Sequence, residues 1–389
     1  MKELHISLNE SGQRLDKLLH KYLSKANTGF IYKMLRKKNI VLNDKKAEGK
    51  EILKEGDSVK IYFSDETLAL MTGGKQGTYE AGNRKAGIRE KSESGTREEE
   101  PRGKYEAVNR KARPQRKSVS KKEVKNTASK KEFLEFSKAT GSQLDILKKR
   151  IVYEDMHLLV IDKPSGWISQ SDDSGARSVN EICLMYLMDK GELTERQLET
   201  FKPSIANRLD RNTSGLILFG KTLPALQSLA ELLRKRTAQK YYLAIVNGKL
   251  DEPKTIKGYL SKNEKLNKVL IKKERFEDSA EINTAYEPMK ITDRYTVLKV
   301  HLITGKTHQI RAHLSSIGHS IIGDPKYGDP KVNSYYKKKY SLDHQLLHSW
   351  QLKFPEDLSG VLEPLAGKTL TAEPPKEFLI EPSNTFSKA

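Results

Sequence analysis

The sequence predicts an α+β protein with two folded domains and a polar linker between them. Two observations lead to this prediction. Helical and strand-like apolar patterns follow one another without a regular β-α alternation, and no glycine-rich phosphate loop is present. The stretch 64–145 is dominated by Gly, Ser, Lys, Arg and Glu. With few aromatic residues it cannot bury enough apolar surface to offset chain entropy, so we expect a disordered basic linker there.

The first expected domain, residues 1–63, combines two helical patterns with two short strands. Apolar residues recur at helical spacing over 14–23 and 30–38, and the segments 40–44 and 58–63 have strand composition. A basic cluster ends the second helix, where positive charge complements the helix dipole and can also meet phosphate.

This first domain resembles the small RNA-binding domain shared with ribosomal protein S-four. The resemblance rests on Gln13-Arg14-Leu15-Asp16, the basic second helix, Val41-Leu42-Asn43 and Glu55-Gly56-Asp57-Ser58-Val59. It implies RNA binding, for which the expected residues are Arg14, Lys17, Arg36, Lys37 and Lys38. A helical cap with solvated surface lysines is the alternative.

The whole chain is strongly basic, with 71 Lys and Arg against 51 Asp and Glu and a formal charge of +20. A protein this basic typically binds a polyanion, and the phosphate backbone of nucleic acid is the commonest one. A solvated lysine-rich surface without a partner is the alternative. We expect RNA as the partner of a monomeric protein.

The single cysteine, Cys183, permits neither an internal disulfide nor a cysteine-based zinc site. The N-terminal residues lack the apolar core of a signal peptide, and no apolar run approaches membrane-spanning length. These features predict a cytoplasmic protein with no membrane contact.

The second expected domain, residues 146–380, begins with strand patterns at 151–155 and 158–163, the latter ended by a Pro-Ser-Gly turn. The remaining patterns predict strands at 215–219, 242–246, 295–303 and 346–354, and helices at 178–189, 223–236 and 307–317. A further helix is expected within 133–150.

The segment Asn207-Arg208-Leu209-Asp210-Arg211-Asn212-Thr213-Ser214-Gly215-Leu216-Ile217-Leu218 carries the strongest chemical signal. It sets Asp210 between two arginines, before a Thr-Ser-Gly turn and an apolar strand. We expect these neighbours to hold the carboxylate ionised, as a nucleophilic aspartate requires. An Asp that caps a turn is the alternative.

This segment resembles the catalytic motif His-Arg-Leu-Asp-x-x-Thr-Ser-Gly-Leu of the RluA-type pseudouridine synthases. Further blocks resemble that family in the same order: Asp162-Lys163-Pro164-Ser165-Gly166, Gln239-Lys240-Tyr241-Tyr242-Leu243-Ala244, Thr304-Gly305-Lys306-Thr307-His308-Gln309-Ile310-Arg311-Ala312-His313, Gly323-Asp324-Pro325-Lys326-Tyr327-Gly328 and Leu347-His348-Ser349-Trp350. The sister RsuA type lacks the Thr-His-Gln-Ile-Arg block. The resemblance implies a catalytic domain built on a mixed antiparallel sheet.

The resemblance assigns catalysis to Asp210, Tyr242 and Arg311. Asp210 would attack a flipped-out uridine, Tyr242 would stack on its base and help move the carbon-5 proton, and Arg311 would pair with Asp210. Substrate binding is expected of Arg208, Ile310, Lys306 and His308. Lys306 replaces the usual arginine, and Asn207 replaces the histidine that usually opens the motif. Asn207 can still form hydrogen bonds but carries no charge.

The reaction itself is redox-neutral and non-hydrolytic, so we expect neither a cofactor nor a metal. His301, His308, His313 and His319 lie close in sequence, but His308 and His313 would not share a helix face and no zinc motif surrounds them.

The sequence therefore predicts an RNA pseudouridine synthase acting on large-subunit ribosomal RNA. Transfer RNA is the alternative substrate, and a non-catalytic RNA-binding assembly factor or a nucleoside hydrolase is the alternative function. Whether Asp210 acts as a covalent nucleophile or as an electrostatic partner stays open.

Overall fold

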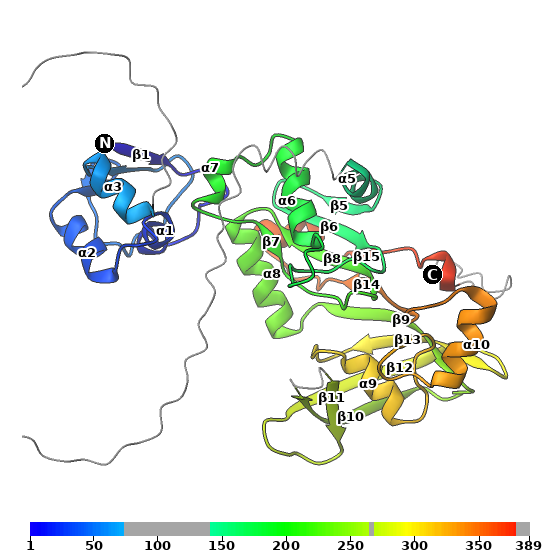
Figure 1. Cartoon of the computed structure of the whole chain (residues 1–389). Coiled ribbons are helices and arrows are strands. Elements are labelled where there is room, and N and C mark those ends of the chain that lie inside the picture. The colour runs from blue at the N-terminus through cyan, green and yellow to red at the C-terminus, as the bar shows by residue number, and fades with distance from the viewer. Residues whose placement is uncertain (74–140, 264–267, 379–389) are drawn as a thin grey trace, which may run out of the picture.

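The computed structural model describes residues 1–73, 141–263 and 268–378. It contains a small first domain and a larger second domain (Figure 1). Residues 74–140 of the expected linker lie outside the described residues. In the ranges that are described, no helix is long and apolar enough to cross a membrane.

The first domain is a four-stranded sheet covered by three helices. The strands are ordered β1 (Lys2–His5), β4 (Ser58–Ile61), β2 (Ile40–Leu42) and β3 (Lys45–Lys46), and every pairing is antiparallel. The helices are α1 (Leu15–Tyr22), α2 (Thr28–Arg36) and α3 (Asp65–Thr72). The apolar faces of α1 and α2 close the core over the sheet, with Leu15, Leu18 and Ile31 fully buried. The two predicted helices and strands are thus present.

The expected boundaries of the linker were wrong at both ends. Residues 65–72 form α3, which Ser64 caps by accepting a hydrogen bond from the Thr67 N–H group, and Leu68 and Met71 pack on the first core. At the other end, α5 (Gly141–Lys148) buries Leu147 in the core of the second domain. α5 lies within the helix expected at 133–150, whereas α3 was missed because two helical turns beside a polar stretch give too short an apolar pattern.

The second domain is a long, mainly antiparallel sheet. Its order is β11 (Lys268–Lys272), β10 (Lys254–Asn263), β12 (Ala280–Ile291), β13 (Tyr295–Leu302), β9 (Gln239–Asn247), β14 (Leu347–Lys353), β8 (Ser214–Gly220), β6 (Leu158–Lys163) and β5 (Ile151–Glu154). β15 (Thr369–Thr371) pairs with β14, and β7 (Ser204–Ile205) pairs with β8. β14 runs parallel to β8 and antiparallel to β9, so it joins the two halves of the sheet.

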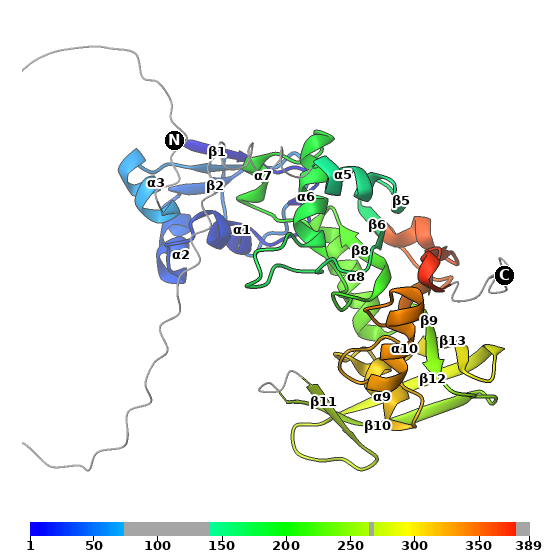
Figure 2. The ribbon, with the colours of Figure 1, turned by 45° about the vertical axis from the view of Figure 1, so that its right-hand side comes forward.

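Helices cover both faces of this sheet. α6 (Val179–Asp189) and α9 (Gln309–Ser316) pack on the face that carries Tyr242, with Cys183 buried in the same core. α8 (Leu223–Lys235) packs against β8 on the opposite side, together with the 3-10 turn 360–365. α7 (Glu195–Leu198) and α10 (Pro330–Tyr340) are the remaining α-helices of the described second domain. Figures 1 and 2 both show the β10–β11 hairpin and the first domain at opposite ends of the molecule.

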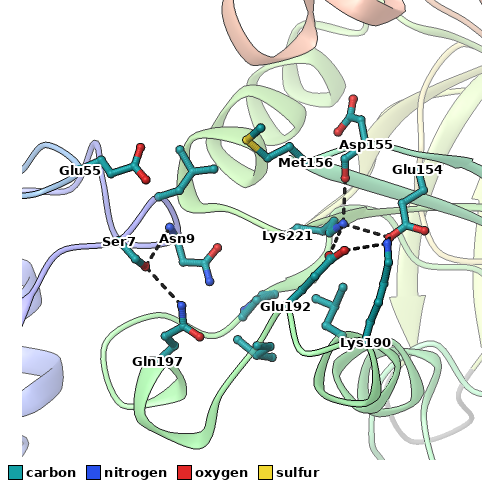
Figure 3. A pocket seen from close by; sticks show the side chains of 14 residues that line it. Ser7, Asn9, Glu55, Glu154, Asp155, Met156, Lys190, Glu192, Gln197 and Lys221 are labelled. Carbon is teal, nitrogen blue, oxygen red and sulfur yellow. Dashed lines mark hydrogen bonds and ion pairs between the residues drawn. The ribbon is translucent and has the colours of Figure 1, made fainter.

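The two domains meet around the α7 region. The Thr200 hydroxyl donates to the buried Glu10 carboxylate (2.6 Å), and the Leu223 N–H donates to the Asn9 carbonyl (3.2 Å). Beside these contacts, side chains of both domains line a cavity of about 630 Å³ (Figure 3). Its lysines are neutralised by acids, since Lys221 binds both Glu154 and Glu192.

Candidate active site

Asp210 lies in the loop between β7 and β8, and the structure holds this loop by its backbone. The Asp210 carbonyl accepts a hydrogen bond from the Thr213 N–H group (3.0 Å), which closes a turn. The segment 163–169 after β6 runs alongside. Its hydrogen bonds join the Ser165 hydroxyl to the Asn212 carbonyl (3.1 Å), the Gly166 N–H to the Arg211 carbonyl (3.0 Å) and the Ser169 hydroxyl to the Leu209 carbonyl (2.7 Å). The loop is therefore fixed on both sides of Asp210.

Lys163 is the buried anchor of this loop. Its side chain is fully buried, and its Nζ atom donates to the carbonyl oxygens of Pro164 (3.0 Å), Trp167 (2.9 Å) and Arg211 (2.8 Å). Burial lowers the pKa of Lys163 to about 7, against the opposing charges of Asp210 and Asp162. Three acceptors require three N–H donors, which only the ammonium form carries, so the geometry favours charged Lys163.

Asn207 anchors the other edge of the loop to β8. Its side-chain amide donates to the Leu216 carbonyl (3.2 Å), and its carbonyl oxygen accepts from the Leu218 N–H group (2.8 Å). A neutral imidazole also offers one donor and one acceptor. Asn207, in place of the usual histidine, therefore still offers one hydrogen-bond donor and one acceptor to the backbone of β8.

Arg311, from α9, is the partner of Asp210. Its Nη1 atom lies 2.7 Å from the Asp210 Oδ2 atom, although the two residues are 101 positions apart in sequence. The rest of the guanidinium donates two hydrogen bonds to Asp324, from Nε to Oδ2 (2.7 Å) and from Nη2 to Oδ1 (2.9 Å). The exposed fractions of the side chains are 27% for Asp210, 5% for Arg311 and 0% for Asp324. The carboxylate therefore faces solvent while its support is buried.

The charges of this triplet stabilise one another. Burial alone would lower the pKa of Arg311, but the hydrogen bonds and charges of Asp324 and Asp210 raise it overall. Burial alone would raise the pKa of Asp324, but Arg311 and the N–H groups of Lys326 and Tyr327 lower it. Both groups are therefore ionised at neutral pH, as a two-pronged Arg–carboxylate pair requires.

The arginines beside Asp210 in sequence, which were expected to hold its carboxylate ionised, do not pair with it in the structure. Arg208 donates to the Gln170 side chain (3.3 Å), and Arg211 pairs with Asp172 (3.2 Å). The guanidinium groups of Arg208 and Arg211 are therefore directed to Gln170 and Asp172 rather than to Asp210. Arg208, expected to bind substrate, is exposed next to the site.

Tyr242 and Ile310 supply the apolar wall of the site. Both are buried in the same core cluster, with exposed fractions of 6% and 4%. Burial raises the pKa of Tyr242 to about 12; the Asp210 charge raises it as well, and a hydrogen bond with Ser349 lowers it. Tyr241 faces the other side of the sheet, where it stacks on His301, as expected for adjacent strand residues.

His308 and Tyr327 close the side of the site next to Arg311. His308 has a left-handed backbone (φ 54°), and its Nε2 atom lies 3.8 Å from the Asp210 Oδ2 atom. Its Nδ1 atom is 3.0 Å from the Tyr327 hydroxyl, which also accepts a hydrogen bond from the Val269 N–H of β11 (3.0 Å). Burial lowers the pKa of His308, which Asp210 only partly offsets, so the imidazole is neutral at neutral pH.

The other predicted residues lie at the surface. Lys306, expected to bind substrate, is exposed in the loop before α9. In the first domain Lys17, Arg36, Lys37 and Lys38 are exposed and have no ion pair within the described residues. Arg14 instead pairs with Asp16 through Nε (3.1 Å) and Nη2 (2.8 Å), which leaves its charge partly neutralised.

The histidines that lie close in sequence separate in the fold. His301 stacks on Tyr241, the His313 Nδ1 atom is 2.9 Å from the Thr284 hydroxyl, and His319 contacts the Asn247 carbonyl (3.0 Å). Within the ranges that the structure describes, no three His, Cys, Asp or Glu residues gather as metal ligands.

The sequence motifs contained Asp324, Lys163 and Tyr327, but the reasoning from sequence gave them no role. Asp324 follows a glycine and precedes a proline, a pattern that reads as a turn, and only the fold brings it to Arg311. Lys163 could have been noticed, because it is a lysine at the end of the apolar strand pattern 158–163.

Comparisons with known proteins point to one family. The family described as RNA pseudouridylate synthase matches residues 157–316. Ribosomal large subunit pseudouridine synthase C from Vibrio cholerae is 31% identical over 245 residues, which cover 63% of this chain and 71% of that protein. Ribosomal large subunit pseudouridine synthase D from Nitrosomonas europaea is 32% identical over 225 residues, covering 56% of this chain and 61% of the relative.

Another relative, synthase C from Pasteurella multocida, is 36% identical over 219 residues, 55% of this chain and 62% of its own length. The chain thus spans about three fifths of the length of the Nitrosomonas and Pasteurella relatives. Among solved structures, human RNA Pseudouridylate Synthase Domain Containing 4 has the same fold, with a TM-score of 0.50 and 21% identity over 63% of this chain and 95% of the human one.

Proposed function

The chain belongs to the RNA pseudouridylate synthase family, and on this premise we propose that it converts uridine to pseudouridine in RNA. The observation that carries the proposal is the arrangement of Asp210, whose carboxylate is 27% exposed while Arg311, its partner at 2.7 Å, is 5% exposed. A carboxylate that is paired with a buried arginine and open to solvent on one side suits attack on, or electrostatic stabilisation of, an electron-poor sugar carbon.

The bond changes define what these residues must do. The bond from the ribose C1′ atom to the base N1 atom breaks, and C1′ bonds to C5 of the same uracil. C5 loses a proton and N1 gains one. The product nucleotide is therefore an isomer of the substrate, and no electron acceptor or water is consumed. The target must leave its stack to reach a buried wall such as the one Tyr242 and Ile310 form.

Within this proposal Asp210 acts on the ribose and Tyr242 on the base. Because the pKa of Tyr242 is about 12, the phenol keeps its proton at neutral pH. Tyr242 therefore offers the flat face of a neutral phenol for stacking on the base, and its hydroxyl is proposed to help move the C5 proton. Arg311 holds the Asp210 carboxylate in place through the 2.7 Å contact while the freed uracil turns.

We propose large-subunit ribosomal RNA as the substrate, in the cytoplasm. Support comes from the names of the Vibrio, Nitrosomonas and Pasteurella relatives, all ribosomal large subunit pseudouridine synthases. The formal charge of +20 suits a large polyanion. The first domain, with exposed Lys17 and the basic residues 36–38, would dock on structured RNA.

The test is pseudouridine formation on unmodified ribosomal RNA and transfer RNA transcripts by wild type and by Asp210→Asn. We expect product on ribosomal RNA with wild type, and no turnover but RNA affinity within a few fold for Asp210→Asn. The matched control is Asp172→Asn, which removes a neighbouring exposed carboxylate (47% side-chain exposure) and should leave turnover intact.

Each other outcome has a defined meaning. Near-normal turnover by Asp210→Asn would show that Asp210 is not the catalytic carboxylate. Product on transfer RNA alone would identify transfer RNA, and not ribosomal RNA, as the substrate. Tight binding without product on either RNA would identify a non-catalytic RNA-binding factor, and release of free uracil would identify a hydrolase.

A further inference from the structure

A second feature of the Tyr242 face is an unpaired, half-buried lysine. Lys240 lies two residues before Tyr242 on β9, so both side chains project from the same face of the sheet. The two Cα atoms of such a pair are about 7 Å apart. Lys240 therefore lies beside the proposed position of the uracil, along the direction of the strand.

The Lys240 ammonium reaches the loop that leads into α9. A β-carbon placed on Gly305 would lie 3.3 Å from the Lys240 Nζ atom, so the amine rests against the Gly305 backbone. The next residue, Lys306, is exposed, and the loop continues to His308 and Arg311 of the site. The amine is thus at the rim of the site.

No carboxylate neutralises this amine among the described residues. The acids of adjacent elements are already used, since Glu231 pairs with Arg234 and Lys235, and Glu287 pairs with Lys299. The field around Lys240 is instead positive. Burial and the charge of Arg236 lower the pKa of Lys240, and Lys240 in turn helps to lower the pKa of His301.

A half-buried ammonium without a counter-ion is unfavourable in the free protein, because no opposite charge offsets the free energy lost when the amine is desolvated. An anionic ligand bound to Lys240 would offset this desolvation cost. The ligand must approach Lys240 from the side that Tyr242 and Asp210 face, where exposed Lys306 follows Gly305 in the adjacent loop. A lysine ammonium binds phosphate as a point charge, and most protein contacts to a nucleic acid go to its phosphates and sugars.

We propose that Lys240, with Lys306 beside it, binds a backbone phosphodiester of the RNA strand adjacent to the target uridine. The site positions the flipped nucleotide by its phosphate while Tyr242 contacts its base. This inference rests on the proposed function, because it takes RNA as the substrate.

The experiment measures RNA affinity over a range of KCl concentrations for wild type, Lys240→Met and Lys240→Arg, with the unmodified ribosomal RNA transcript as the probe. Methionine keeps the apolar stem and removes the charge. We expect the slope of log affinity against log salt to become shallower by about 0.7 to 0.9, the value for one phosphate that is no longer neutralised. Lys240→Arg should restore the slope, and the loss in turnover should appear mainly in KM.

The matched control is Lys353→Met. Lys353 is exposed at the same end of the sheet, opposite Gln239 in the β9–β14 ladder, and so lies on the other face. Its salt slope should equal that of wild type. An unchanged slope for a folded Lys240→Met variant, or an equal change in Lys353→Met, would overturn the phosphate site. Absence of pseudouridine with wild type would refute the proposed function separately, because the salt slope is a binding measurement.

Discussion

Replacing Asp324 by asparagine tests the support of the site, because this carboxylate has no solvent exposure and four donors around it. They are Arg311 Nε (2.7 Å) and Nη2 (2.9 Å) and the N–H groups of Lys326 (2.8 Å) and Tyr327 (3.0 Å). In either orientation the asparagine NH₂ group would face a donor. The change also leaves the buried Arg311 with Asp210 as its one carboxylate partner.

The expected loss follows from this geometry. Removing one partner of a buried ion pair costs about 3 to 5 kcal/mol, and the lower end applies because asparagine still accepts hydrogen bonds on one oxygen. A loss of about 3 kcal/mol should lower the melting temperature of a domain of this size by about 6 to 12 °C. Thermal unfolding followed by circular dichroism at pH 7 measures the shift.

The pH dependence provides a second measurement. Since the pKa of Asp324 is lowered in the folded state, its contribution is fully present above the ordinary carboxyl value of 3.8 and is lost as pH falls through the lower folded value. The difference in unfolding free energy between wild type and Asp324→Asn should therefore narrow below about pH 4. Asp343→Asn, at an exposed carboxylate (75% side-chain exposure), is the control and should change stability by less than about 0.5 kcal/mol. A melting temperature for Asp324→Asn equal to that of Asp343→Asn would refute the reasoning.

Two further predictions concern the sheet and the first domain. Gly215→Ala should abolish the folded second domain, because a β-carbon there would lie 2.2 Å from the Ser349 carbonyl oxygen, and φ is 108°. Gly166→Ala, also at positive φ (87°) but with nothing within 4 Å of the new carbon, should cost only about 1 to 2 kcal/mol in urea unfolding; equal losses would contradict the steric argument. Replacing the basic residues 36–38 by glutamine should weaken RNA binding and flatten its salt dependence by roughly 0.7 to 0.9 for each phosphate that these side chains neutralise in the wild type. Filter binding measures this, and unchanged affinity would exclude these residues from RNA docking.

Much of the second domain could be predicted from local patterns. The strands around 215–219 and 242–246 and the helix 223–236 are long, apolar and strongly periodic, and all three are present as β8, β9 and α8. β10 and α10 were missed for the opposite reason. β10 begins Lys-Thr-Ile-Lys-Gly, which has neither a regular apolar alternation nor a continuous apolar run, and α10 is so polar that only Tyr336 is buried in it. Such segments are stabilised by their neighbours rather than by their own pattern.

The site shows the same division between local and long-range information. The Asp210 motif could be found because its residues are contiguous. The partner of Asp210 could not be derived from its neighbours, since Arg208 and Arg211 are adjacent in sequence but turn outward, whereas Arg311 arrives from another element. The partner of the Asp210 carboxylate is thus determined by the three-dimensional fold, which a short motif does not encode.

The position of β14 in the sheet has a consequence for biosynthesis. β14 is the only strand of the described domain that pairs with both β8 and β9, and it leaves the ribosome about 100 residues after β9. Until residues 347–353 emerge, the half-sheet bearing the Asp210 loop and the half-sheet bearing Tyr242 share no backbone ladder. Non-local pairing of this kind closes late, because the entropy of the long intervening chain opposes it. A nascent chain that lacks residues 347–353 thus holds the two halves of its site apart, and competence for chemistry begins only after this strand has emerged.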